Sequence, residues 1–366
     1  MKIVDVVTQA AKLGVSDVHI TVGKPPVYRL HGILYPLDAV ELKGRLDLLK
    51  GEEIKILLPK DTDEMAREIM TDHQVEKFRE TGELDFSYAV PGTTRVRVNV
   101  FKQRNSTALV MRLLSTRIPS FQDLGLPDVL YYLSRRPDGL VLVTGPTGSG
   151  KSTSLAAMID LINQEKRVHI LTLEDPIEYL HKHNLSLINQ REIGQDTHSF
   201  AAALRAALRE DPDVILVGEM RDLETIGIAI TAAETGHLVL ATLHTSSAAE
   251  TIDRVIDVFP PSQQQQIRIQ LANTVQGILS QQLIPRIDKP GRVAALEVLV
   301  ATPAIRNLIR EGKTFQIPTQ LQTGARYGMQ TLDMSLRLLY QKRVISKEEV
   351  VNRASDPESL LRSLGG

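Results

Sequence analysis

Hydrophobic and polar positions follow two different patterns along the chain. Over residues 1–115, short apolar runs of strand length alternate with turns. Near the amino end Ile3, Val6, Val7 and Ala10 share one face of a short amphipathic helix, which is more often core than membrane anchor. A helix is also predicted at 62–81, strands at 18–22, 27–30, 84–90, 95–101 and 108–114, and a charged loop or insertion at 41–60. These elements predict a small α+β domain.

From residue 139 to about residue 285 the pattern changes to apolar strands that alternate with helices. Such alternation predicts an α/β domain whose parallel sheet is covered by helices on both faces. The strands are expected at 140–144, 168–173, 214–217 and 238–243, and the helices at 152–163, 199–210 and 222–235. We divide the chain into an N-terminal domain (1–115), a linker rich in Pro and Gly (116–128), an α/β core (129–300) and a helical C-terminal region (301–366).

Composition limits the kind of protein. The 366 residues carry a formal net charge of −1 and include no cysteine, which excludes disulfides and thiolate metal sites. A near-neutral chain has no bulk attraction to nucleic acid or to acidic lipid. No apolar run approaches the ~18 residues of a membrane-spanning helix, and the amino end lacks the long apolar core of a secretion signal. We therefore expect a protein of the cytoplasm.

The segment GPTGSGKST at 145–153 follows an apolar predicted strand and opens a predicted helix. Glycines let main-chain N–H groups crowd around an anion, and the helix N-terminus adds further N–H groups and a positive dipole end. In this pattern Lys151 reaches the β- and γ-phosphates and the Ser152 hydroxyl ligates Mg²⁺. We therefore expect ATP and Mg²⁺ at this loop. The candidate nucleotide ligands are Gly145, Pro146, Thr147, Gly148, Ser149, Gly150, Lys151, Ser152 and Thr153.

Carboxylates follow two of the predicted parallel strands, where ligands of an open sheet bind. Glu174, Asp175 and Glu178 follow the strand at 168–173, and Glu219 follows the strand at 214–217. Hydrolysis requires one carboxylate to orient or deprotonate water and another to hold Mg²⁺ or its waters. Glu178 and Glu219 are the favoured pair, but the residue pattern alone does not rank the four acids.

Histidines and arginines supply further candidates. His244 follows the strand at 238–243 and suits a sensor of the γ-phosphate. His237 precedes that strand, about 23 Å away if extended, so the two imidazoles cannot share one metal ion. Arg97 lies on the polar face of the strand at 95–101, and Arg112 lies on the following strand. This basic face is either a solvated sheet, a nucleic-acid surface or a source of arginines for a neighbour's nucleotide.

Several motifs together resemble a known family. They are VSDVHI (15–20), RVRVNVF (95–101), GPTGSGKST, LEDPIE (173–178), ALREDPDVILVGEMRD (207–222) and AETGHLVLATLHTSSA (233–248). The chain is similar to the secretion and pilus assembly ATPases through nearly its whole length. It most resembles their type IV pilus retraction branch, because it lacks the four-cysteine zinc insertion of many relatives and carries AIRNLI at 304–309.

The resemblance implies a RecA-like P-loop core with a PAS-like N-terminal domain, assembled as a homohexameric ring. It implies Glu178 as catalytic base, Glu219 as the Walker-B carboxylate, His244 as sensor and His237 as a supporting residue. Arg97 and Arg112 become the arginines that help to hold ATP. The implied motor drives pilin depolymerisation and twitching motility from the cytoplasmic face of the inner membrane. Its partner there is the pilus platform protein, with no nucleic acid involved.

Three other functions remain open. An assembly or secretion ATPase without the zinc insertion belongs to the same superfamily. A nucleic-acid motor would favour a basic groove with stacking platforms, against which the near-neutral charge and the 4% aromatic content argue. A non-catalytic nucleotide-binding scaffold would need the phosphate loop but no catalytic base.

Overall fold

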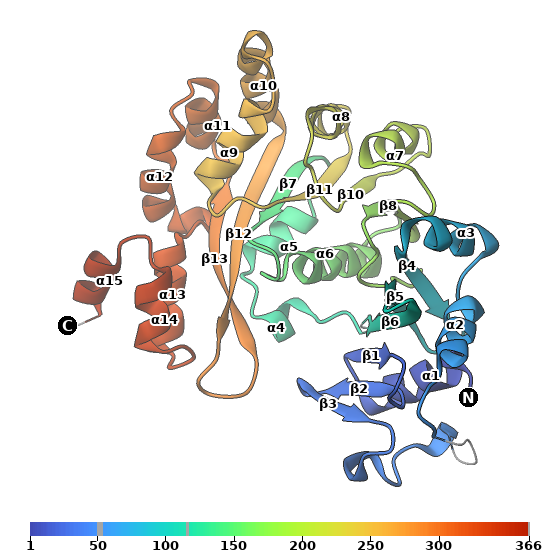
Figure 1. The fold of residues 1–366 in the computed structure, drawn as a ribbon. Helices are drawn as coiled ribbons and strands as arrows, with labels where there is room; N and C mark the ends of the chain where they lie inside the picture. Colours follow the sequence, from blue (N-terminus) through green and yellow to red (C-terminus); the bar gives the residue numbers. More distant parts are fainter. Residues whose placement is uncertain (50–53, 115–116, 365–366) are drawn as a thin grey trace. The chain divides into compact units, whose positions relative to one another are not determined.

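The computed structural model describes residues 1–49, 54–114 and 117–364. By its internal contacts the chain divides into two units (Figure 1). The N-terminal unit comprises Met1–Arg117 with Glu178–Leu180, and the C-terminal unit comprises Ile118–Ile177 with His181–Gly366. Residues 50–53 of the loop expected at 41–60, and residues 115–116 at the end of the expected first domain and the start of the expected linker, lie outside the described residues.

The N-terminal unit is an antiparallel sheet with helices. Its strand order is β3-β2-β1-β6-β5-β4. Val96, Val98 and Val100 of β5 are fully buried, as their alternation with polar residues predicts. The elements are α1 (Ile3–Leu13), β1 (Asp17–Ile20), β2 (Val27–Leu30), β3 (Ile33–Pro36), α2 (Pro59–Glu68), α3 (Asp72–Thr81), β4 (Glu83–Val90), β5 (Thr94–Gln103) and β6 (Ser106–Leu113).

The single helix predicted at 62–81 is wrong. The chain forms two helices, because α2 ends at Glu68 and α3 begins at Asp72. Thr71 between them accepts a hydrogen bond from the Gln74 N–H, while the Gln74 side chain accepts from the Thr71 N–H. This reciprocal cap starts a new helix where periodicity alone suggested continuation. Strand β3 was not predicted either.

The C-terminal unit is built on a seven-stranded sheet of order β13-β12-β7-β11-β10-β8-β9. Neighbouring strands from β12 to β9 run parallel, which confirms the predicted parallel core, whereas β13 pairs antiparallel with β12. Three of these strands were not predicted, namely β9, β12 and β13. The strands are β7 (Gly139–Thr144), β8 (His169–Glu174), β9 (Leu187–Glu192), β10 (Val214–Val217), β11 (Leu238–Leu243), β12 (Val275–Pro285) and β13 (Arg292–Val300).

Helices cover both faces of this sheet, as the alternating pattern predicts. Leu140 and Leu142 of β7 belong to a core shared with α7–α11, whereas Val141 and Val143 belong to a core shared with α5 and α6. A third cluster packs the C-terminal helices on Ile284 and Ala295. The helices are α4 (Phe121–Leu124), α5 (Val129–Ser134), α6 (Lys151–Glu165), α7 (Phe200–Ala207), α8 (Leu223–Glu234), α9 (Ala248–Asp257), α10 (Pro261–Thr274), α11 (Pro303–Arg310), α12 (Ile317–Thr323), α13 (Leu332–Gln341), α14 (Lys347–Arg353) and α15 (Pro357–Ser363).

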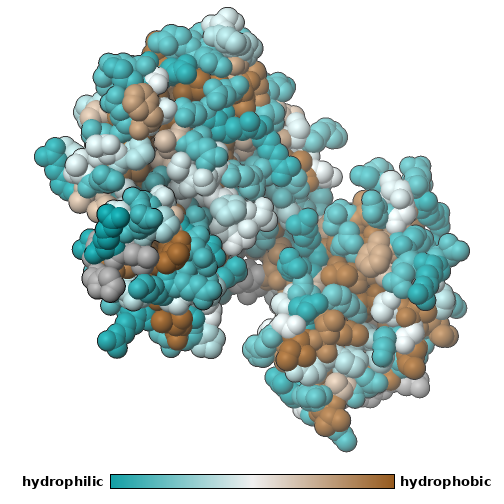
Figure 2. Space-filling model, turned by 60° about the vertical axis from the view of Figure 1, so that its left-hand side comes forward, coloured by the Kyte–Doolittle hydropathy of each residue, from teal (hydrophilic) through white to brown (hydrophobic). Residues whose placement is uncertain are grey.

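The face shown in Figure 2 is mostly hydrophilic, with separate hydrophobic patches. Among the large apolar side chains that remain exposed are Val40 and Phe315. Among the described residues, no helix combines the length and the hydropathy that a bilayer crossing demands.

Candidate nucleotide-binding site

The loop between β7 and α6 has the backbone that its glycines predict. Gly145, Gly148 and Gly150 all have positive φ angles, of 141°, 78° and 89°. Strand β7 is buried along its whole length, so the loop starts from a fixed point. Gly145 also needs the absence of a side chain, since a Cβ there would lie 2.2 Å from the carbonyl oxygen of Gln281.

The end of α6 at this loop can accept an anion. Its N-cap is Gly150, which supplies no side-chain hydrogen bond to the first turn of this 15-residue helix. The Ser149 hydroxyl is buried and has no hydrogen-bond partner among the described residues. Unsatisfied donors at the positive end of a helix are suited to phosphate oxygens. The residues present therefore fit the phosphates of a nucleotide.

The side chain of Lys151, the first residue of α6, folds back onto the loop. It is 9% exposed, and its ammonium donates to the carbonyls of Gly145 at 2.7 Å and Pro146 at 3.1 Å. Burial lowers the pKa of Lys151, while the negative charge of Glu219 opposes the shift. The lysine thus sits at the loop with its charge balanced in part by a carboxylate.

Glu219 and His244 meet beside this lysine. They follow β10 and β11, and β11 lies between β10 and β7 in the sheet. Nε2 of His244 lies 2.9 Å from Oε1 of Glu219, and Nε of Arg221 lies 2.5 Å from the same oxygen. Burial raises the pKa of Glu219, but the hydrogen bond from Arg221 and the charge of His244 outweigh it, so the pKa lies below its usual value. The carboxyl ends of three adjacent strands therefore bring together a cation, a carboxylate and an imidazole.

The donor set fits Mg²⁺ only with help from phosphate oxygens and water. No group of three or more His, Cys, Asp or Glu side chains in the described part of the chain could hold a metal ion. Magnesium in nucleotide sites is commonly held by one or two protein oxygens together with phosphates and waters. The Ser152 hydroxyl and the Glu219 carboxylate are of the required chemical type.

The second predicted carboxylate belongs to the other unit. Glu178 groups by its contacts with the N-terminal unit, as do Arg97 and Arg112. Burial raises the pKa of Glu178, while the positive charges of both arginines oppose that rise. Arg112 also donates from Nε to Asp17 Oδ1 at 2.9 Å. A carboxyl group with a raised pKa is chemically suited to proton transfer.

The remaining candidates have local partners. Glu174 accepts hydrogen bonds from the hydroxyl of Thr172 at 2.6 Å and from Gln190 at 3.2 Å. His237 precedes β11, whereas His244 follows its carboxyl end, so the structure does not bring His237 to the phosphate loop of its own chain. Nδ1 of His237 lies 2.9 Å from the Ala232 carbonyl at the end of α8.

Sequence reasoning missed two residues of the site, Arg221 beside Glu219 and Gln281 beside the loop. The carboxamide of Gln281 in β12 bonds to Ser149 O and to the Ser154 hydroxyl. Strand β12 was not predicted, and no local motif marks this glutamine. Only the pairing of β12 with β7 reveals it.

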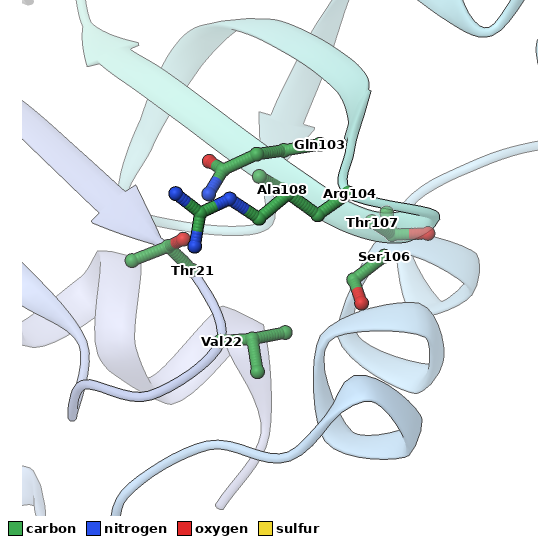
Figure 3. Close-up of a pocket in the computed structure, with 7 residues that line it drawn as sticks. All are labelled: Thr21, Val22, Gln103, Arg104, Ser106, Thr107 and Ala108. Atoms are coloured by element: carbon green, nitrogen blue, oxygen red, sulfur yellow. The ribbon is translucent and has the colours of Figure 1, made fainter.

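A separate cavity of about 140 Å³ lies in the N-terminal unit at the turn between β5 and β6 (Figure 3). In Figure 3 the guanidinium of Arg104 reaches across the cavity toward Thr21. None of the residues predicted to bind nucleotide lines it. The lining residues are Thr21, Val22, Gln103, Arg104, Ser106, Thr107 and Ala108.

Comparison with known proteins decides the family. Residues 81–352 match the family described as type II/IV secretion system protein. The chain belongs to this family. It is 49% identical over 359 residues to the type IV pilus retraction ATPase PilT of Pseudomonas aeruginosa, covering 98% of this chain and 100% of that protein. It is 48% identical over 335 residues to a twitching motility protein of Neisseria gonorrhoeae, covering 92% and 86% of the two chains.

The fold agrees with that relationship. The crystal structure of the pilus retraction motor PilT with bound ADP superposes with a TM-score of 0.89 at 49% identity, and the match covers 99% of each chain. These matches confirm the predicted resemblance to the retraction ATPases. They also confirm the predicted fold class of an α/β, RecA-like core joined to a smaller α+β domain.

Proposed function

We propose that this protein is a motor ATPase that hydrolyses ATP to drive retraction of type IV pili, and with it twitching motility. The main support is the meeting of Lys151, Glu219 and His244 at the carboxyl ends of β7, β10 and β11, beside a glycine loop shaped for phosphate. The full-length relationship to PilT and to a twitching motility protein indicates what the hydrolysis drives.

In this proposal the loop backbone from Gly145 to Thr153 and the Lys151 ammonium bind the phosphates of ATP. The Ser152 hydroxyl and Glu219 hold Mg²⁺ or its waters. When bound, Mg²⁺ neutralises charge on the phosphate oxygens and orients them. His244, held by Glu219, senses the γ-phosphate.

Glu178 takes the proton from the attacking water, and its raised pKa suits that role. Arg97 and Arg112 supply positive charge to the phosphates. His237 has a supporting role through its hydrogen bond at the end of α8.

The working assembly in this proposal is a homohexameric ring at the cytoplasmic face of the inner membrane. The partner of the ring is the pilus platform protein. The ring itself binds no nucleic acid. ATP binding and product release would move the N-terminal domain against the core and so perform work on the platform. In this proposal the N-terminal domain comprises residues 1–115, the linker 116–128, the core 129–300 and the helical C-terminal region of the core domain 301–366.

A single substitution tests the enzyme proposal against a nucleotide-binding scaffold. Glu178→Gln keeps the shape of the side chain but cannot accept the proton, so ADP and ATP binding should persist while turnover is lost. Glu174→Gln is the matched control, because it removes a neighbouring carboxylate that already has two hydrogen-bond donors. Equal turnover of wild type and Glu178→Gln would contradict the proposed base and favour Glu174, Asp175 or a scaffold.

A genetic test separates retraction from assembly. If the protein retracts pili, cells without it should carry pili that do not retract. If it assembles pili or secretes proteins, its loss should abolish pili or secretion instead. Time-lapse microscopy of labelled pili distinguishes these outcomes.

A further inference from the structure

One side chain of β12 holds the phosphate loop from outside the loop. Gln281 is 3% exposed, and both ends of its carboxamide are used. Its Nε2 donates to the carbonyl oxygen of Ser149 at 2.7 Å, and its Oε1 accepts from the hydroxyl of Ser154 at 2.8 Å. Ser149 belongs to the loop, and Ser154 lies in the first turn of α6. Gln281 therefore joins the loop to the helix that follows it.

The same residue limits the loop sterically. A Cβ on Gly145 would lie 2.2 Å from Gln281 O, and one on Gly150 would lie 2.7 Å from Gln281 Nε2. A Cβ on Gly148, in contrast, would meet open space. At two of the three loop glycines, a side chain would therefore meet Gln281.

The neighbouring residue reinforces this contact. Ser280 pairs in parallel register with Thr144, the last residue of β7, and their hydroxyl oxygens are 2.9 Å apart. Gln281 therefore comes one residue later, level with the start of the loop. Strand β12 holds both the end of β7 and the loop that leaves it.

The hydrogen bond to Ser149 O has a consequence for anion binding. In a trans peptide the N–H points opposite to the C=O. With Ser149 O held toward β12, the N–H of Gly150 is directed away from β12. If this peptide plane rotated, a carbonyl oxygen would take the place of an N–H group and repel an anion. An anion-binding loop of this kind depends on N–H groups that are already aligned.

We propose that Gln281 is a positioning residue of the nucleotide site, whose carboxamide fixes the Ser149–Gly150 peptide plane so that the loop is preformed for phosphate. This inference rests on the proposed nucleotide-binding function. A merely structural glutamine would lower stability when replaced but would leave nucleotide affinity unchanged. The two roles therefore predict different measurements.

The test measures ADP affinity by titration calorimetry, and the melting temperature without nucleotide, on the purified full chain. Gln281→Met keeps length and volume but removes both hydrogen bonds, and we expect ADP to bind about tenfold more weakly. Gln281→Glu can still accept from Ser154 but cannot donate to Ser149 O. It also adds negative charge beside the loop, so we expect a larger loss.

The control is Gln282→Met. Gln282 is the next residue on the same strand, points to the opposite face, and contacts Arg353 at 3.4 Å. Its ADP affinity should stay within about twofold of wild type. ADP affinities within twofold of wild type for both Gln281 variants would overturn the inference. Failure of the wild-type chain itself to bind ADP would instead overturn the proposed function.

If neither Gln281 variant folds, the ADP affinity of Ser154→Ala tests the inference. This substitution leaves Gln281 in place but removes the donor that fixes which way the carboxamide points, and alanine suits a helix. We expect ADP affinity to fall by about threefold. Unchanged affinity in Ser154→Ala would overturn the inference.

Discussion

His244 and Glu219 form a hydrogen-bonded pair, with Nε2 2.9 Å from Oε1, although they follow different strands. The pair exists because β10 and β11 are parallel neighbours whose carboxyl ends coincide. Arg221 bonds to the same oxygen, so Glu219 is a carboxylate held in its ionised form.

The ionised state of Glu219 predicts a pH dependence of stability. Burial raises its pKa, but Arg221 and His244 lower it by more, so the folded-state pKa lies below the usual value of a glutamate. A carboxyl group with a lowered pKa stabilises the fold above its unfolded pKa, and this contribution is lost as the pH falls through the folded pKa. The melting temperature of the wild type should therefore fall further between about pH 5 and pH 3 than the melting temperature of Glu219→Gln.

The control for this pH series is Glu234→Gln. Glu234 is exposed on α8 and accepts a hydrogen bond from Gln270. Its pH profile should follow that of wild type. If the profile of Glu219→Gln also followed wild type, the carboxylate would not be stabilised by its neighbours.

Two loop glycines form a matched pair for a stability test. Gly145 and Gly148 both have positive φ, of 141° and 78°, so an alanine is strained at each position. Only at Gly145 would the new Cβ collide, at 2.2 Å from Gln281 O. Gly145→Ala should therefore lower the melting temperature more than Gly148→Ala, and it should weaken ADP binding more. Equal effects would show that the loop moves away from β12 without cost.

Lys151→Gln should weaken nucleotide binding by tenfold or more, since a charge-assisted bond to phosphate contributes about 1.5–3 kcal/mol. The melting temperature without nucleotide should not fall, because a buried ammonium is costly and its pKa is already lowered by burial. Lys166→Gln is the control. Lys166 lies past the far end of α6 and donates to the carbonyls of Arg135 and Arg136. A similar loss of ADP affinity in both variants would indicate a general effect of charge.

The AIRNLI segment has buried and exposed residues. Their substitution can test core packing separately from the coupling of ATP turnover to retraction. Ile305 is fully buried and Leu308 is 9% exposed, and both belong to the same core as α10. Ile305→Ala should therefore cost about 2–5 kcal/mol of stability, and it cannot report cleanly on retraction. Asn307 is exposed on the same helix. Asn307→Ala should leave stability within about 0.5 kcal/mol.

Retraction in cells and ATP turnover in vitro should then be compared for Asn307→Ala. Normal turnover with impaired retraction would place a coupling surface on the exposed side of α11. Normal values for both would leave the segment with a packing role.

The phosphate loop was predictable from the sequence because its determinants are local. A buried strand, three glycines and a helix start follow one another from Leu140 to Ser152, and each residue acts on its own backbone or its near neighbours. The four strands of the predicted parallel core were predictable for the same reason, since their apolar runs are continuous. The expectation that Glu219 and His244 lie near the loop followed from the rule that parallel strands end at one edge.

Strand β12 shows what the sequence pattern could not give. Its apolar residues are interrupted by Gln276, Ser280, Gln281 and Gln282. The pattern therefore does not predict a buried strand, yet β12 lies between β7 and β13. Gln276, Ser280 and Gln281 are buried, and each has a hydrogen-bond partner elsewhere in the chain, such as Thr144 for Ser280.

The sequence by itself determined that the chain has a phosphate loop on an α/β core, because periodicity and glycine conformation act over a few residues. Only the tertiary structure decided that Gln281 contacts Ser149, which lies 132 positions earlier. A hydrogen bond over that separation depends on the order of strands in the sheet. The packing of the whole unit sets that order, and no local pattern encodes it.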